Sequence, residues 1–106
     1  MAKYLYQAVY TKSGLDGLLK EGGSNRREAV AQAAESLGGT LEAFYYAFGG
    51  TDVFAILDLP DNVSASAFSL LVAAGGGATL KTTVLITPEE VDQATKKTIA
   101  YRPPGG

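Results

Sequence analysis

The chain has 106 residues, of which 46% are apolar and 19% charged, and its formal net charge is −2. This length suits one domain with one hydrophobic core, and the composition excludes a disordered acidic chain. The nine Lys and Arg residues are scattered along the chain, so no basic stripe follows a phosphate backbone and we expect no nucleic-acid partner.

The missing residue types restrict the chemistry further. The chain has neither Cys nor His, which excludes disulfides, thiolate nucleophiles and the usual ligands of zinc, copper and haem iron. We expect no metal site and no cofactor, so any catalysis would depend on carboxylates, Tyr, Lys or Arg. No stretch has the pattern of a signal peptide or a membrane span, and a chain without Cys fits a reducing compartment. We therefore expect a cytoplasmic protein without a membrane partner.

The first predicted element is a strand from Lys3 to Tyr10, where aromatic and β-branched residues alternate with others. A short helix follows, because Leu15, Leu18 and Leu19 lie at helical spacing before a Gly-Gly pair.

A second, longer helix comes next. Ser24 or Asn25 is placed to cap it, and with Asn25 as the cap Glu28 occupies the capping-box position. Gly38-Gly39 is expected to end this helix.

Two further strands, Thr40 to Phe48 and Val53 to Leu59, are expected to form an antiparallel hairpin, because the Gly-rich segment between them suits a tight turn. A two-residue loop at Gly50-Thr51 predicts the cross-strand register. The predicted pairs are Phe48 with Val53, Tyr46 with Ala55 and Phe44 with Leu57.

Ser64 to Ala74 forms an uncharged helix, which we expect to be buried on more than one side. A strand from Thr79 to Ile86 and a helix from about Pro88 to Lys97 follow, the latter with a Thr cap and Pro at its first position. We predict a single domain over residues 1–98 and an extended tail over residues 99–106, which is rich in Pro and Gly.

The order of these elements predicts an α+β fold. It matches a ferredoxin-like β-α-β-β-α-β sandwich, in which a four-stranded antiparallel sheet carries its helices on one face, with an extra short helix after the first strand and a C-terminal helix. The first and third strands would be central, because Glu42 and Lys81 place charges on the second and fourth strands, as edge strands tend to have.

Short motifs spread over nearly the whole chain are similar to those of a known family. They include Tyr4-Leu5-Tyr6-Gln7, Gly14 to Gly23, Arg26-Arg27, Leu37-Gly38-Gly39, Asp52-Val53, Leu59-Pro60-Asp61, Thr82 to Leu85, Thr87-Pro88-Glu89-Glu90 and Tyr101 to Pro104. Together they resemble the GYD domain family of small bacterial and archaeal proteins. One departure is Gly50-Thr51-Asp52, where Thr51 replaces the Tyr of the Gly-Tyr-Asp that names the family.

The resemblance implies a ferredoxin-like fold akin to the dimeric α+β barrels, without an agreed activity. Relatives of the barrels include cofactor-independent monooxygenases, lactone isomerases and haem enzymes. Carrying their chemistry to this chain would be analogy of fold alone.

The candidate site residues each have a structural alternative. Asp52 follows the Gly-rich turn, where it could act as a base at a pocket mouth or simply accept hydrogen bonds from the turn backbone. Arg26, at the start of a helix, could bind a carboxylate or phosphate, or form a surface salt bridge. The strand tyrosines, with Tyr6, Tyr45 and Tyr46 as candidates, could line a pocket for a flat apolar ligand, or build the core and a subunit interface.

Both faces of the predicted sheet are apolar. On the hairpin, one face carries Phe44, Tyr46, Phe48, Val53 and Leu57, and the other carries Leu41, Tyr45, Phe54 and Ile56. Because a soluble monomer rarely exposes so large an apolar face, we expect a second copy to cover the face without helices. Alternatively, the C-terminal helix folds back over it.

Two functional hypotheses follow. The first is a homo-oligomeric module, a dimer or a multiple of dimers, that binds a small apolar or aromatic ligand. The alternative is a cofactor-independent enzyme of the isomerase or monooxygenase type that uses Asp52 and Tyr hydroxyls. A cavity of a few hundred Å³ with converging polar groups would be required for the enzyme.

Overall fold

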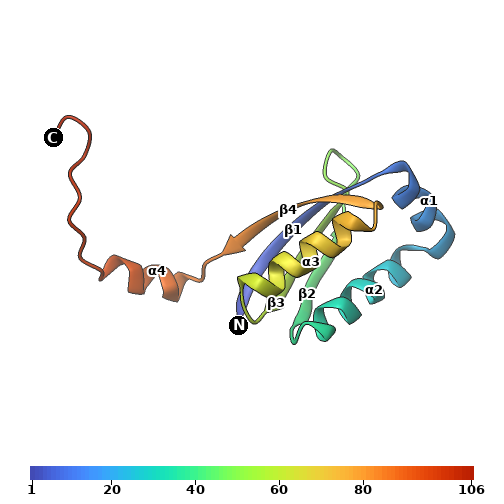
Figure 1. The fold of residues 1–106 in the computed structure, drawn as a ribbon, viewed down its shortest axis with the longest axis horizontal. Coiled ribbons are helices and arrows are strands. Elements are labelled where there is room, and N and C mark those ends of the chain that lie inside the picture. Colours follow the sequence, from blue (N-terminus) through green and yellow to red (C-terminus); the bar gives the residue numbers. More distant parts are fainter.

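Four antiparallel strands form one sheet in the computed structural model, which describes residues 1–106 (Figure 1). In chain order the elements are β1 (Ala2–Tyr10), α1 (Lys12–Glu21), α2 (Gly23–Ser36), β2 (Thr40–Tyr46), β3 (Val53–Leu59), α3 (Asn62–Ala74), β4 (Ala78–Leu85) and α4 (Pro88–Thr95). The strand order β2-β3-β1-β4 confirms that β1 and β3 are central. The architecture is α+β and consistent with a ferredoxin-like arrangement.

The core lies between the sheet and the pair of helices α2 and α3. Alternate side chains of the central strands face these helices and are buried. They are Tyr4, Tyr6 and Ala8 of β1 and Val53, Ala55, Leu57 and Leu59 of β3. Phe68 of α3 packs on the Tyr6 ring with 4.8 Å between ring centroids, and the Tyr6 hydroxyl donates to the Ala65 carbonyl at 2.8 Å. A buried aromatic ring of β1 therefore fixes α3 on the sheet.

The hairpin between β2 and β3 has a longer loop than predicted. β2 ends at Tyr46, which pairs with Val53, so the predicted register with Phe48 opposite Val53 is wrong by two residues. Phe48 has a φ of 56°, which takes it out of the extended conformation. The N–H of Asp52 donates to the Ala8 carbonyl of β1, and the Asp52 carbonyl accepts the N–H of Ala47, the residue after β2. The end of the loop is therefore bonded to both of its neighbouring segments.

A bulge in β2 moves one side chain to the opposite face from the one expected. The register shifts between Leu41 and Ala43, so Glu42 is the extra residue and Leu41 pairs with Leu57. An extra residue reverses the alternation of side chains beyond it. Leu41 therefore packs against the core, and the prediction that it shares a face with Tyr45 is wrong.

The second helix begins earlier than predicted. α2 starts at Gly23, its N-cap is Gly22 with φ 86°, and no side chain caps it. The side-chain amide of Asn25 instead donates to the Glu21 carbonyl, because only one glycine separates α1 from α2. The predicted cap at Ser24 or Asn25 is thus wrong.

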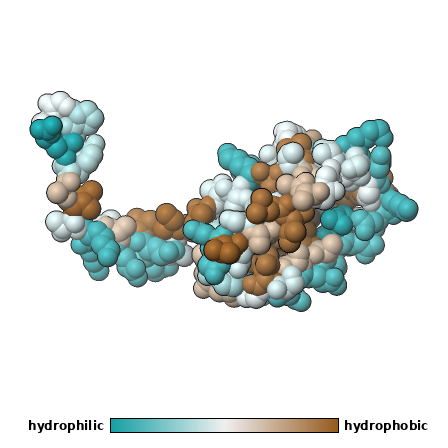
Figure 2. All heavy atoms as spheres, viewed as in Figure 1, coloured by the Kyte–Doolittle hydropathy of each residue, from teal (hydrophilic) through white to brown (hydrophobic).

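The uncharged helix α3 is buried on one side only. Ala65 and Phe68 are buried, but the side chains of Leu70 and Leu71 are 70% and 72% exposed. Figure 2 shows apolar side chains gathered over α3. The prediction of burial on several sides is wrong because α2 does not close against α3, and a cavity lies between the two helices.

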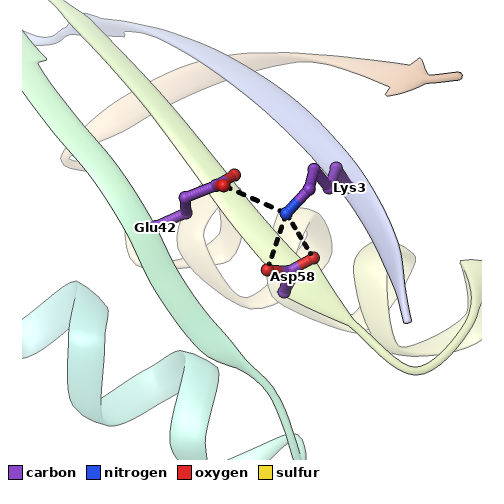
Figure 3. A network of polar contacts seen from close by, with 3 residues as sticks. All are labelled: Lys3, Glu42 and Asp58. Carbon is purple, nitrogen blue, oxygen red and sulfur yellow. Dashed lines mark hydrogen bonds and ion pairs between the residues drawn. The ribbon is translucent and has the colours of Figure 1, made fainter. Parts of the chain in front are cut away.

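The opposite face of the sheet carries no helix. Exposed apolar side chains lie on it, including Val9, which is 43% exposed, and Tyr45, which is 71% exposed. At one end the Lys3 ammonium lies 3.0 Å from carboxylate oxygens of Glu42 and Asp58 (Figure 3). We call this surface the helix-free face.

The C-terminal helix does not fold back over the helix-free face. α4 and the residues after it project away from the body (Figure 1), and residues 88–106 are all exposed. The predicted cap is confirmed, since Thr87 and Glu90 form a reciprocal capping box with Pro88 at the first helical position. The radius of gyration, 17.0 Å, exceeds the ~13 Å typical of a compact chain of this length. None of the four helices is long and apolar enough to cross a membrane.

Candidate functional site

A cavity of about 410 Å³ lies between the sheet and the helices α1, α2 and α3. Strand side chains form its floor, and apolar side chains of the helices form two of its walls. The floor has small side chains at Ala8, Val53, Ala55 and Ala78 beside larger ones at Tyr6, Phe44 and Leu80, and the apolar walls comprise Val30 of α2 with Phe68, Leu71 and Val72 of α3. A volume of this size and lining is within the range of small-molecule sites.

One face of α1 turns two glycines toward this space, and the space is open at Gly17. Gly14, Gly17 and Glu21 line the cavity and lie three and four residues apart, so they share one side of the helix. A core-facing stripe normally carries apolar side chains that fill the space beneath the helix. Here two of the three positions have no side chain, and a Cβ on Gly17 would meet no atom within 4 Å.

The N-terminal end of α1 is fastened to the loop between α3 and β4. The N–H of Thr11 donates to the Gly77 carbonyl at 2.9 Å, and the Thr11 hydroxyl donates to the Gly76 carbonyl at 2.7 Å. The same hydroxyl accepts the N–H of Gly14 and caps α1. α1 therefore forms a fixed wall at this end of the cavity.

Polar groups reach the cavity from α1, α2 and the end of β1. They are Tyr10, Ser13, Glu21 and Arg26. A guanidinium nitrogen of Arg26 lies 3.3 Å from a carboxylate oxygen of Glu21. These two are the only charged residues in the lining.

Tyr46 stands next to this polar group without lining the cavity. Its hydroxyl donates to the Gly23 carbonyl at 3.1 Å. Burial, and then the neighbouring Tyr10, raise the pKa of Tyr46 to about 12, with Arg26 opposing the shift. Tyr46 is therefore a neutral hydrogen-bond donor that holds the start of α2 against the sheet.

The predicted ligand-binding residues are separated by the fold. Tyr6 and Arg26 both line the cavity. The Tyr6 hydroxyl is already bonded to Ala65, and burial raises its pKa. Tyr45 lies on the helix-free face, on the other side of the sheet from the cavity.

Asp52 does not line the cavity, and its side chain binds a backbone N–H of β1. Its carboxylate accepts the N–H of Tyr10 in β1 at 2.8 Å, a backbone group outside the turn that the structural alternative had in view. Thr51, which replaces the family tyrosine, is 3.4 Å from the Gln7 side-chain oxygen and donates to it. Both residues connect the hairpin loop to β1.

Sequence reasoning missed the residues that create the space. Gly17 and Ala55 were not singled out, yet they leave the cavity unfilled. The signal was present in α1, where glycines interrupt the leucines at helical spacing. Which of the two sides of α1 faced the sheet could not be read from that pattern.

A second hollow, of about 480 Å³, runs between α3 and β4 and is more open. Its polar groups bond to one another. The Tyr4 hydroxyl donates to the Asn62 side-chain oxygen at 2.6 Å, and the Ser69 and Thr82 hydroxyls are 2.8 Å apart. Because these groups already have partners, the cavity beneath α1 is the stronger candidate site.

No group of three Asp or Glu residues anywhere in the chain is arranged to hold a metal ion.

Comparison with known proteins identifies a family. The model of the GYD domain matches residues 4–95, which span β1 to α4. No curated protein and no solved structure matches the chain.

Proposed function

The chain belongs to the GYD domain family, and we propose that it is a homo-oligomeric module that binds a small apolar or aromatic ligand beneath α1. The observation that supports this proposal is the cavity of about 410 Å³. The space is partly open to solvent, so a small molecule can enter it from outside. A space with apolar walls and a few polar groups on one side is typical of a ligand site.

The geometry gives the enzymatic alternative little support. Asp52 is bonded to the Tyr10 N–H and does not line the cavity. The hydroxyls of Tyr6 and Tyr46 are bonded to backbone carbonyls, and their pKa values are raised, so neither is suited to act as a base. Catalysis by these groups stays a prediction.

A neutral fluorescent probe tests the binding proposal. N-phenyl-1-naphthylamine is apolar and becomes fluorescent in a dry site, so titration should show saturable binding to the wild-type protein. Gly17→Leu should weaken that binding at least about tenfold, because the new side chain enters open space in the cavity. Asp16→Leu adds an apolar side chain at an exposed neighbouring position on the same helix and should leave the affinity unchanged.

Two results would contradict the binding proposal. One is a wild-type protein that does not bind the neutral probe. The other is equal affinity in the wild-type and Gly17→Leu proteins, provided that thermal unfolding shows both to be folded.

The second part of the proposal is that another copy of this chain covers the helix-free face. Exposed apolar side chains lie on this face, among them Val9, Phe54 and Tyr45. The charges on this face are also self-complementary. At one end of the face, the two negative charges of Glu42 and Asp58 outnumber the one positive charge of Lys3. Lys81 lies farther from that end, where it pairs with Gln7 across the strands. A two-fold axis can bring Lys81 of each copy toward the acidic end of the other.

Light scattering coupled to gel filtration tests the self-association. At micromolar concentration the expected mass is twice the 11.0 kDa of one chain, or a multiple of that dimer. A single species of 11.0 kDa across the concentration range would contradict this part and leave the ligand proposal standing.

A further inference from the structure

We infer that the ligand of this cavity is an amphipathic acid, with one carboxylate that pairs with Arg26 and an apolar body that lies against α3. This inference rests on the proposed ligand-binding function. It follows from how charge is distributed over the cavity walls.

The two sides of the cavity differ in polarity. The α3 side contributes Phe68, Leu71 and Val72, and the whole of α3 carries no charged residue. The opposite side contributes both charged residues of the lining, Glu21 and Arg26, from the adjoining ends of α1 and α2. A ligand that satisfies both sides must be apolar along most of its length and charged at one end.

Arg26 has capacity to bind a further acid. The only hydrogen bond of its side chain is the contact to Glu21 at 3.3 Å, which is longer than the ~2.7–2.9 Å of good charge-assisted bonds. A guanidinium has five N–H donors and can hold a carboxylate in a bidentate pair. Most of those donors are therefore free to bind a ligand.

The position of Arg26 also favours an anion. It lies in the first turn of α2, where the helix dipole is positive and a cation is unfavourable unless an anion accompanies it. No acidic residue lies in that turn, and no side chain caps the helix. The positive charge of Arg26 and the positive end of the α2 dipole therefore both favour an anion beside the cavity.

Glu21 competes with the ligand for Arg26. Its carboxylate lines the same cavity, and the ion pair is half exposed, with 37% of the Arg26 and 47% of the Glu21 side chain accessible. Such pairs contribute little to folding, so changing either residue should leave the protein folded. Removing the Glu21 charge should help an incoming acid, whereas removing the Arg26 charge should hinder it.

A matched pair of probes tests the inference. 2-Naphthoate carries a carboxylate and 2-naphthylmethanol carries a neutral alcohol on the same ring, so calorimetric titration of both isolates the effect of the charge. The wild-type protein should bind the acid at least about tenfold more tightly than the alcohol, the effect of one charge-assisted bond. Arg26→Gln should lower the affinity for the acid to about that for the alcohol, and Glu21→Gln should increase the affinity for the acid.

Arg27→Gln is the control, because Arg27 carries the same charge one residue away, pairs with Glu28 and does not line the cavity. It should leave the ratio of affinities intact. If the alcohol binds as tightly as the acid to the wild-type protein, or if Arg26→Gln and Arg27→Gln act alike, the inference is wrong although the binding function stands. If neither probe binds, and the neutral naphthylamine also fails, both proposals are wrong.

Discussion

Gly14 in α1 packs so closely against Gly77 that a Cβ on Gly14 would overlap the carbonyl oxygen of Gly77. That carbonyl also accepts the N–H of Thr11, which begins the turn into α1. The contact between two glycines therefore sets how closely the first helix approaches the loop that precedes β4.

Gly14→Ala should destabilise the protein by about 1–3 kcal/mol, because overlap with a fixed backbone outweighs the ~1 kcal/mol by which alanine favours a helix. Gly17→Ala is the matched variant three residues along, where a Cβ meets no atom within 4 Å. It should stabilise the protein by about 0.5–1 kcal/mol. Urea unfolding measures both, and equal effects of the two substitutions would contradict the close contact.

Asp52→Ala should lower the free energy of unfolding by about 1–3 kcal/mol, because the Tyr10 N–H loses its acceptor. Asp52→Asn keeps an acceptor oxygen and should lose less. Neither change should alter the affinity of the cavity for the neutral naphthylamine, since Asp52 does not line it. A large loss of binding at unchanged stability would instead support a role for Asp52 in the site.

Alkaline pH should weaken the fold through Tyr46. Its pKa is about 12 in the folded protein against 10.0 for a free tyrosine. Below pH 10 both states keep the proton, so the contribution is fully present, and between pH 10 and about 12 only the unfolded state ionises, so the free energy of unfolding falls. Tyr6, whose pKa is also raised, acts in the same direction.

Urea unfolding at several pH values between 9 and 12 measures this effect. Tyr46→Phe should flatten the pH dependence in that window, whereas Tyr45→Phe, at an exposed side chain, should not. Identical pH profiles for wild-type and Tyr46→Phe proteins would show that Tyr46 ionises alike in both states.

Replacing either of two adjacent tyrosines with Glu should have different effects, because Tyr45 and Tyr46 face opposite sides of the sheet. Tyr45→Glu changes the helix-free face and should convert the proposed dimer to a folded monomer. Tyr46→Glu should instead lower the free energy of unfolding of each chain by at least about 2 kcal/mol. The Tyr46 ring lies on the helix-covered face of the sheet, where it packs against Phe44 and stacks on Phe48. Light scattering and thermal unfolding of both variants separate the two effects, and a dimeric Tyr45→Glu protein would argue against this interface.

The order and position of most elements could be predicted because each follows a local signal. Thr87 and Pro88 begin α4 as expected, and the charges at Glu42 and Lys81 correctly marked the edge strands. The start of α2 could not be predicted, because a glycine at φ 86° replaced the expected side-chain cap. The bulge at Glu42 was equally hidden, since nothing local distinguishes an extra residue in a strand.

The candidate site was predictable only in part. Arg26 and Tyr6 were separate candidates in the sequence, and only the fold brings them to one cavity. Tyr45 and Tyr46 are neighbours in sequence and so face opposite sides of the sheet. The cavity itself depends on α2 and α3 standing apart, which is a property of tertiary packing. Side-chain patterns within one helix do not report the distance to another.

The projecting C-terminal segment makes this protein easy to handle without disturbing its interior. α4 caps itself through Thr87 and Glu90, and the chain end lies at the opposite extreme of a molecule 57 Å long from α1 (Figure 1). α4 and the residues after it would thus act as a spacer that keeps a fluorophore, an affinity tag or a surface attached after Gly106 away from the cavity and the sheet. Immobilising the chain by that end leaves both the cavity mouth and the sheet free for solution partners.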